Sequence, residues 1–126
     1  MNSALRNRRR GREAEKQSPL SEKQLSQCIV DLAQLLGWRS YRTWRSLHSP
    51  AGFPDLVMVR KGQLIFAELK SDKGRLTPAQ QEWLDALHEV GDYNDSVRTY
   101  LWRPADWFAG RVDEALLDHG PGAYQE

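Results

Sequence analysis

Two short apolar runs separated by Lys61 and Gly62 are the clearest pattern of hydrophobic and polar positions in the chain. Residues 55–60 and 63–70 consist largely of β-prone side chains, and a Lys-Gly pair between two such runs is a turn signal. This pattern predicts a β-hairpin with a two-residue loop. The second run carries apolar residues on both of its faces, as expected of a central strand that is covered on both sides.

Charged residues lie at the open end of this hairpin, where a buried strand would be apolar. A two-residue loop places Asp55 directly opposite Glu68 on one face of the pair. A three-residue loop would place Asp55 opposite Ala67 and pointing away from Glu68, because side-chain direction alternates along a strand. Lys70 shares the face of Glu68 for the same reason. The two-residue loop therefore predicts that Asp55, Glu68 and Lys70 converge.

Two carboxylates that face each other across a hairpin repel unless a cation lies between them. Their Cβ atoms would be roughly 5 Å apart. Oxygen ligands at that spacing suit a hard divalent ion, and Mg²⁺ is the first candidate because it needs few protein carboxylates and keeps several waters. The competing interpretation is that Glu68 and Lys70 are solvated side chains on the polar face of an edge strand. The apolar residues on both faces of the second run favour the metal site.

Two amphipathic helices are predicted on either side of the hairpin, each opened by a capping box. Ser21 caps the first helix, which ends before Gly37. Thr77 and Gln80 open the second, and Gly91 is expected just past its end. The buried stripes are formed by Leu25, Cys28, Ile29, Leu32 and Leu36 in the first helix and by Trp83, Leu84, Leu87 and Val90 in the second.

The remaining pattern completes one domain. Residues 97–102 alternate as a last strand does, and a final helix is predicted from about Ala105 to Leu117. A chain of 126 residues with 40% hydrophobic residues supports one core. We therefore expect a folded domain over residues 18–118, between a basic, disordered arm (1–17) and a short flexible tail (119–126).

Five segments, in this order along the chain, resemble the virus-type replication-repair nuclease (VRR-NUC) domain of the PD-(D/E)xK nuclease superfamily. They are Thr43-Trp44, Gly52-Phe53-Pro54-Asp55-Leu56-Val57, Ala67-Glu68-Leu69-Lys70, Leu76-Thr77-Pro78-Ala79-Gln80, and Trp102-Arg103-Pro104 with Asp106-Trp107. The resemblance implies an α/β fold with an α-β-β-β-α-β core, in which helices flank a mixed central sheet and a C-terminal helix follows. It also implies cleavage of DNA phosphodiesters with Mg²⁺, for which Mn²⁺ can substitute.

The resemblance also assigns roles to the charged residues of the hairpin. Asp55 and Glu68 would bind the metal. To these two ligands we add the backbone carbonyl of Leu69 as a proposed third, because it lies between Glu68 and Lys70 in the chain. Lys70 would assist the attacking water. A metal in this position polarises the phosphate and lowers the pKa of a bound water, while Lys70 positions that water or offsets developing charge.

Two residues at helix starts are further site candidates with two interpretations each. Glu22 is three residues before Leu25, so its spacing predicts the inward face of the first helix. The resemblance makes it a possible metal ligand, whereas the alternative is a first-turn carboxylate favoured by the helix dipole. The resemblance gives Gln80 a role in orienting water or a phosphate oxygen, and the alternative is a capping glutamine.

Positive charge is concentrated in two stretches although the net charge is only +1. The first contains Arg6, Arg8, Arg9, Arg10 and Arg12, and is either a phosphate-contacting arm or a solvated terminus. The second contains Arg39, Arg42 and Arg45, interleaved with Trp38, Tyr41 and Trp44. Together with His48 and Lys73, which flank the hairpin motif, the second stretch is a candidate nucleic-acid surface.

These observations favour a structure-selective DNA endonuclease that acts on branched or Holliday-junction-like DNA, with no small-molecule cofactor. The stand-alone phage and bacterial members that the chain resembles imply a homodimer, for which the C-terminal helix would supply an exposed aromatic surface. The alternatives are a non-catalytic nucleic-acid-binding module of the same fold and a restriction-like or RNA-directed nuclease. The apolar runs are too short for a bilayer and no signal peptide is apparent, so we expect a cytoplasmic protein in a bacterium or phage-infected cell.

Overall fold

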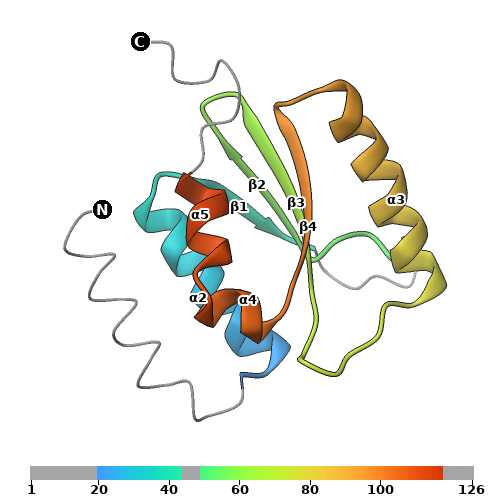
Figure 1. Ribbon diagram of the computed structural model, residues 1–126, viewed down its shortest axis with the longest axis horizontal. Helices are drawn as coiled ribbons and strands as arrows, with labels where there is room; N and C mark the ends of the chain where they lie inside the picture. The colour runs from blue at the N-terminus through green and yellow to red at the C-terminus, as the bar shows by residue number, and fades with distance from the viewer. Residues whose placement is uncertain (1–19, 44–48, 118–126) are drawn as a thin grey trace.

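The computed structural model describes residues 20–43 and 49–117 (Figure 1). The predicted arm and tail therefore lie outside the described residues. The elements of the described part are α2 (Glu22–Leu35), β1 (Arg39–Arg42), β2 (Leu56–Arg60), β3 (Gln63–Leu69), α3 (Pro78–Tyr93), β4 (Val97–Trp102), α4 (Pro104–Phe108) and α5 (Arg111–Leu117). The order α-β-β-β-α-β is confirmed. None of the helices in this part is long and apolar enough to cross a membrane.

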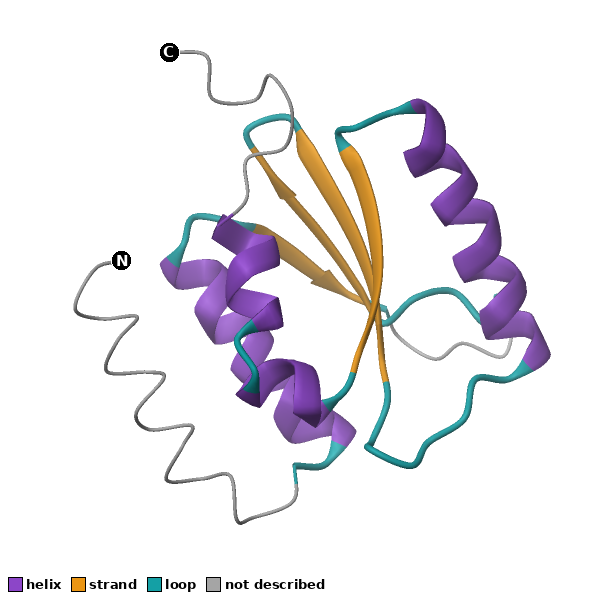
Figure 2. Ribbon diagram, viewed as in Figure 1, coloured by secondary structure: helices purple, strands orange, loops and turns teal. Residues whose placement is uncertain are grey.

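A four-stranded mixed sheet with the strand order β1-β2-β3-β4 lies at the centre of the fold. β1, β2 and β3 are antiparallel neighbours, whereas β4 runs parallel to β3. A parallel pair requires a crossover connection, and α3 supplies it. Figure 2 shows α2, α4 and α5 on one side of the sheet and α3 on the other. The expected α/β fold is therefore confirmed.

The hairpin has the predicted two-residue loop. Arg60 pairs with Gln63, and Val57 pairs with Phe66, so the register is the one that aligns the acidic residues. Lys61 and Gly62 both have positive φ, at 47° and 78°, which is the backbone of a type I′ turn. The turn matches the twist of the flanking strands and thereby fixes every pairing along the hairpin.

The main core fills the space between the sheet and α2, α4 and α5. Both middle strands contribute to it, and Met58 and Ile65 are fully buried. The α3 side is thinner, because Leu84 is the buried residue of that helix and Val90, which the stripe predicted to be buried, is exposed. A cluster of rings closes this side instead, with Phe53 edge-on to both Phe66 and Trp83.

Two helix boundaries differ from those that the sequence predicts. α3 continues through Gly91 to Tyr93. Glycine at this position serves packing and does not end the helix, since a Cβ on it would lie 2.9 Å from the carbonyl oxygen of Val97. The final helix is interrupted by a turn at residues 109–110 and forms two short helices, α4 and α5. Trp107 is buried in the core, so the exposed aromatic surface expected on this helix is absent at that residue.

Candidate active site

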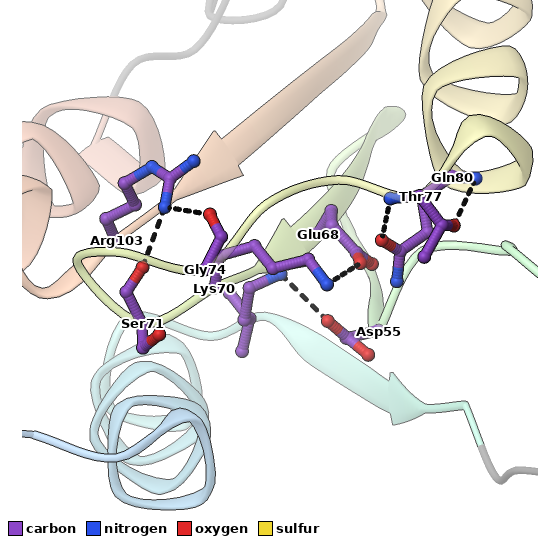
Figure 3. Close-up of polar contacts among 9 residues, drawn as sticks. Asp55, Glu68, Lys70, Ser71, Gly74, Thr77, Gln80 and Arg103 are labelled. Carbon is purple, nitrogen blue, oxygen red and sulfur yellow. Dashed lines mark hydrogen bonds and ion pairs between the residues drawn. The ribbon is translucent and has the colours of Figure 1, made fainter.

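Asp55 is held in place by hydrogen bonds to its carboxylate, drawn in Figure 3, and to its backbone carbonyl. It immediately precedes β2, and the pairing of Leu56 with Ala67 makes Glu68 its neighbour across the hairpin. The backbone N–H of Leu69 donates to Asp55 Oδ2 at 2.8 Å. The backbone N–H of Thr43, just after β1, donates to the Asp55 carbonyl oxygen at 2.9 Å. Both the backbone and the carboxylate of Asp55 are therefore fixed.

Glu68 is a buried carboxylate in the described part of the chain. Its side chain is 1% exposed, and neither carboxylate oxygen accepts a hydrogen bond from the residues that the structure describes. Burial is the main cause that raises the pKa of Glu68 to about 8, and the nearby carboxylate of Asp55 raises it further. Lys70 opposes this rise in pKa. A buried acid without hydrogen bonds is costly, which indicates a site built for a cation.

Lys70 follows the last residue of β3 and lies at the mouth of the site. Its Nζ atom is 3.9 Å from Glu68 Oε2, and its side chain is 12% exposed. This distance is too long for a hydrogen bond, so the pair is a loose ion pair. The Lys70 backbone N–H donates to the carbonyl oxygen of Trp102 at 3.1 Å, which fixes the chain at this point.

The donor set fits a hard divalent cation. Glu68 offers two buried oxygens without hydrogen-bond partners among the described residues, and Asp55 offers a second carboxylate across the hairpin. No group of three or more His, Cys, Asp or Glu residues suited to a metal occurs in the described ranges. Mg²⁺ needs only one or two protein carboxylates and takes its other ligands from water and phosphate, so the pair is sufficient for it.

The loop before Asp55 packs directly on the first turn of α3. A Cβ added to Gly52 would lie 2.6 Å from the backbone carbon and oxygen of Ala79. Phe53 then inserts its ring next to Trp83, with ring centroids 5.0 Å apart. The start of α3 is therefore held beside the hairpin end that carries the two acids.

The family of the chain follows from its match to a known sequence model. The sequence model of the VRR-NUC domain matches residues 2–94, which is most of the chain. The chain belongs to the VRR-NUC family. Its fold is accordingly the PD-(D/E)xK nuclease fold that the resemblance implied.

A solved structure is also similar to this VRR-NUC domain. It is Hjc, described as a Holliday junction resolvase, from the archaeal hyperthermophile Archaeoglobus fulgidus. The two chains are 23% identical, the match covers 62% of this chain and 67% of Hjc, and the TM-score is 0.41. No match was found among the curated proteins.

The VRR-NUC resemblance made Glu22 and Gln80 site candidates, and the structure separates them. Glu22 is exposed in the first turn of α2, so it is not buried with the inward stripe, and its role as a metal ligand stays a prediction. The first turn extends past the buried part of the helix, whose stripe begins at Leu25. Gln80 is half-buried and completes the capping box, because its Oε1 accepts from the Thr77 N–H at 2.9 Å. A role for Gln80 toward DNA would therefore fall to its amide nitrogen.

Arg103 contributes to this site in a way that sequence reasoning missed. Its Nη1 donates to the carbonyl oxygens of Ser71 and Gly74, both at 2.7 Å (Figure 3). The same atom lies 3.4 Å from the carbonyl oxygen of Asp72. One guanidinium group thus holds the loop that follows Lys70. The signal in the sequence is only indirect, since Arg103 lies in one of the segments that resemble the VRR-NUC domain.

The predicted DNA contacts of the VRR-NUC domain are only partly described. Arg8, Arg9, Arg10, Arg45 and His48 lie outside the described residues. Arg39 and Lys73 are exposed. Arg42 is exposed as well, but its Nη2 donates to Gln27 Oε1 of α2 at 2.9 Å, so it is directed to the helix side of the sheet.

Proposed function

We propose that this protein is a metal-dependent DNA endonuclease that hydrolyses phosphodiester bonds in branched or junction DNA. The observation that carries the proposal is the pair Asp55 and Glu68 at the end of the hairpin, with the Glu68 carboxylate buried and without hydrogen bonds from the described residues. A module that only bound nucleic acid would gain nothing from two adjacent carboxylates, since they repel phosphate. The same pair would serve a nuclease as metal ligands.

The residues of the site would have two roles, metal binding and positioning of the attacking water. Asp55 and Glu68 would hold Mg²⁺ or Mn²⁺, together with the Leu69 carbonyl. When bound, the ion would polarise the phosphate and provide an activated water. The Leu69 N–H fixes the Asp55 carboxylate, so this ligand needs no rearrangement to bind. Lys70 lies at the edge of the pair and would position the water or offset charge that develops on the phosphate.

Exposed basic residues would keep the DNA in register with these groups. Arg39 on β1 and Lys73 in the loop after Lys70 are exposed, as phosphate contacts must be. A homodimer remains part of the proposal, because a junction presents two related strands to a two-fold symmetric protein. Because Trp107 is buried, its ring is not available for that interface.

The decisive test is cleavage of labelled linear, flap and four-way-junction DNA by the purified chain, with Mg²⁺, Mn²⁺ or EDTA. We expect metal-dependent cleavage that favours the branched substrates and is lost in Glu68→Ala. Glu82→Ala removes an exposed carboxylate on α3 and serves as the matched control, which should remain active. Equal cleavage of all substrates would rule out structure selectivity. No cleavage with either metal would rule out the nuclease and favour a binding module.

A further inference from the structure

Within the described ranges, one region of the sheet on the side of the acidic pair is exposed. Side chains of Arg39, Tyr41 and Val59 form it, and we call these three residues the open face. Arg39 pairs with Val59, and Tyr41 pairs with Val57, so all of them share one side of the sheet. α3 covers this side mainly over β4 (Figures 1 and 2). Over β1 and β2, the described helices leave this side of the sheet exposed at Arg39, Tyr41 and Val59.

The open face lies on the same side as the proposed metal site. Asp55 is two residues before Val57 on that side, and Glu68 is two residues after Phe66, the partner of Val57. The opposite orientation holds for Arg42, which bonds to α2 on the other side of the sheet. From the spacing of residues and strands, Tyr41 is about 8 Å from Asp55 along the sheet. That distance is within reach of a nucleotide bound at the site.

Tyr41 differs from the other aromatic residue described in this basic stretch. Trp38 is buried in the core and donates its indole N–H to the Leu116 carbonyl oxygen. The Tyr41 side chain is 61% exposed, and Val59 beside it is 42% exposed. An exposed ring on a strand is a platform on which a nucleic-acid base can stack.

Charge favours nucleic acid over a second copy of the chain as the occupant. β1, β2 and β3 contain three arginines, Arg39, Arg42 and Arg60, and one acidic residue, Glu68, which is buried. Arg39 and Arg42 lie on the edge strand β1, so two copies that met through their β1 edges would bring these two arginines of each copy together. Like charges in opposed positions destabilise such a pairing. A phosphate backbone has the complementary charge.

We propose that the open face binds unpaired nucleotides next to the scissile phosphate, with the Tyr41 ring stacked on a base and Arg39 in contact with a phosphate. This inference rests on the proposed function, because it takes the acidic pair as the place of cleavage. A base must be unpaired to present its face to a side chain in this way. Tyr41 would therefore select DNA that is open near the cleavage point over an intact duplex.

The test is a binding assay in EDTA with the full chain and two probes. One is a single-stranded oligonucleotide that contains 2-aminopurine, and the other is a duplex of the same length. Tyr41→Ala should weaken single-strand binding by about tenfold and abolish the quenching of 2-aminopurine, whereas Tyr41→Phe should preserve both. Arg39→Gln should weaken binding of both probes and lower the salt dependence by about one phosphate contact.

Tyr93→Ala is the matched control, since Tyr93 is 87% exposed at the far end of α3. It should bind both probes as the wild type does. The inference is overturned if Tyr41→Ala binds the single strand normally, or if it loses affinity equally for single strand and duplex. It is also overturned if Tyr41→Ala changes the sedimentation of the DNA-free protein, which would make the open face a protein interface. Because binding needs no cleavage, a chain that cleaves nothing yet shows these binding differences would refute the proposed nuclease alone.

Discussion

Replacing the buried acid by its neutral isostere, Glu68→Gln, should stabilise the metal-free protein. The folded state raises the pKa of Glu68 from its ordinary value of 4.5 to about 8. Between these values the native protein holds a proton that the unfolded chain has released. The free energy of unfolding of the wild type must therefore fall as pH rises from 4.5 to 8. Glu68→Gln carries no titratable group at this position and avoids that loss.

The magnitude follows from the width of this pH window. From 4.5 to neutrality there are about 2.5 pH units, and each corresponds to about 1.4 kcal/mol, so keeping Glu68 protonated in the native state costs about 3 kcal/mol at pH 7. The amide of Gln has nearly the same shape and can donate to Asp55, so little of this gain should be lost to packing. For a domain of this size, 3 kcal/mol is a large share of the total stability.

Urea unfolding at pH 5 and pH 8 in EDTA measures the effect. The stability difference between Glu68→Gln and the wild type should be small at pH 5 and several kcal/mol at pH 8. Glu82→Gln is the control: it removes an exposed carboxylate and keeps Glu68, so its stability should fall between pH 5 and pH 8 as that of the wild type does. In a parallel series, Mg²⁺ should stabilise the wild type and leave Glu68→Gln unchanged, because only a ligand of the native state adds stability.

Two results would refute this reasoning. If Glu68→Gln were less stable than the wild type at pH 8, the carboxylate would be satisfied in the native state. If the difference were the same at pH 5 and pH 8, Glu68 would not titrate in this window.

Three further substitutions test how the site is positioned. Gly52→Ala should destabilise the fold by roughly 2 kcal/mol in thermal unfolding, because the methyl group would collide with the Ala79 backbone; unchanged stability would contradict this contact. Arg103→Met should lower kcat by roughly 100-fold with little change in KM, since the loop of residues 71–74 would lose its anchor. Arg103→Lys should recover part of kcat. Equal kcat in the wild type, Arg103→Met and Arg103→Lys would show that Arg103 is not needed to hold this loop. Lys70→Ala should abolish cleavage while circular dichroism shows an intact fold, and full activity would remove Lys70 from the mechanism.

Local chemistry explains which parts of the structure could be predicted from the sequence. The hairpin register follows from Lys61 and Gly62, whose turn type depends on two adjacent residues. The starts of α2 and α3 follow from Ser21 and Thr77, whose capping boxes close within four residues. Since the pairing of Asp55 with the opposite strand depends only on the turn, the acidic pair could be predicted as well.

Contacts between distant segments explain the remainder. Gly91 resembles a helix terminator in sequence, and only the carbonyl of Val97 shows why glycine lies inside α3. Arg103 reaches loop carbonyls about 30 positions earlier in the chain, and no spacing rule encodes such a contact. Glu22 has the right helical phase for the inward face, but phase alone does not tell how far the core extends along a helix.

The smallest fragment that keeps the candidate active site intact must include the parallel strand β4. The segment matched by the family ends at residue 94, before β4 begins. Yet Glu68 pairs with Leu101 of that strand, and Arg103 follows directly after it. A fragment trimmed to the matched segment would expose β3 as a sheet edge and release the loop beyond Lys70. In a fusion of this nuclease domain to a larger protein, the fusion point should therefore lie beyond α5.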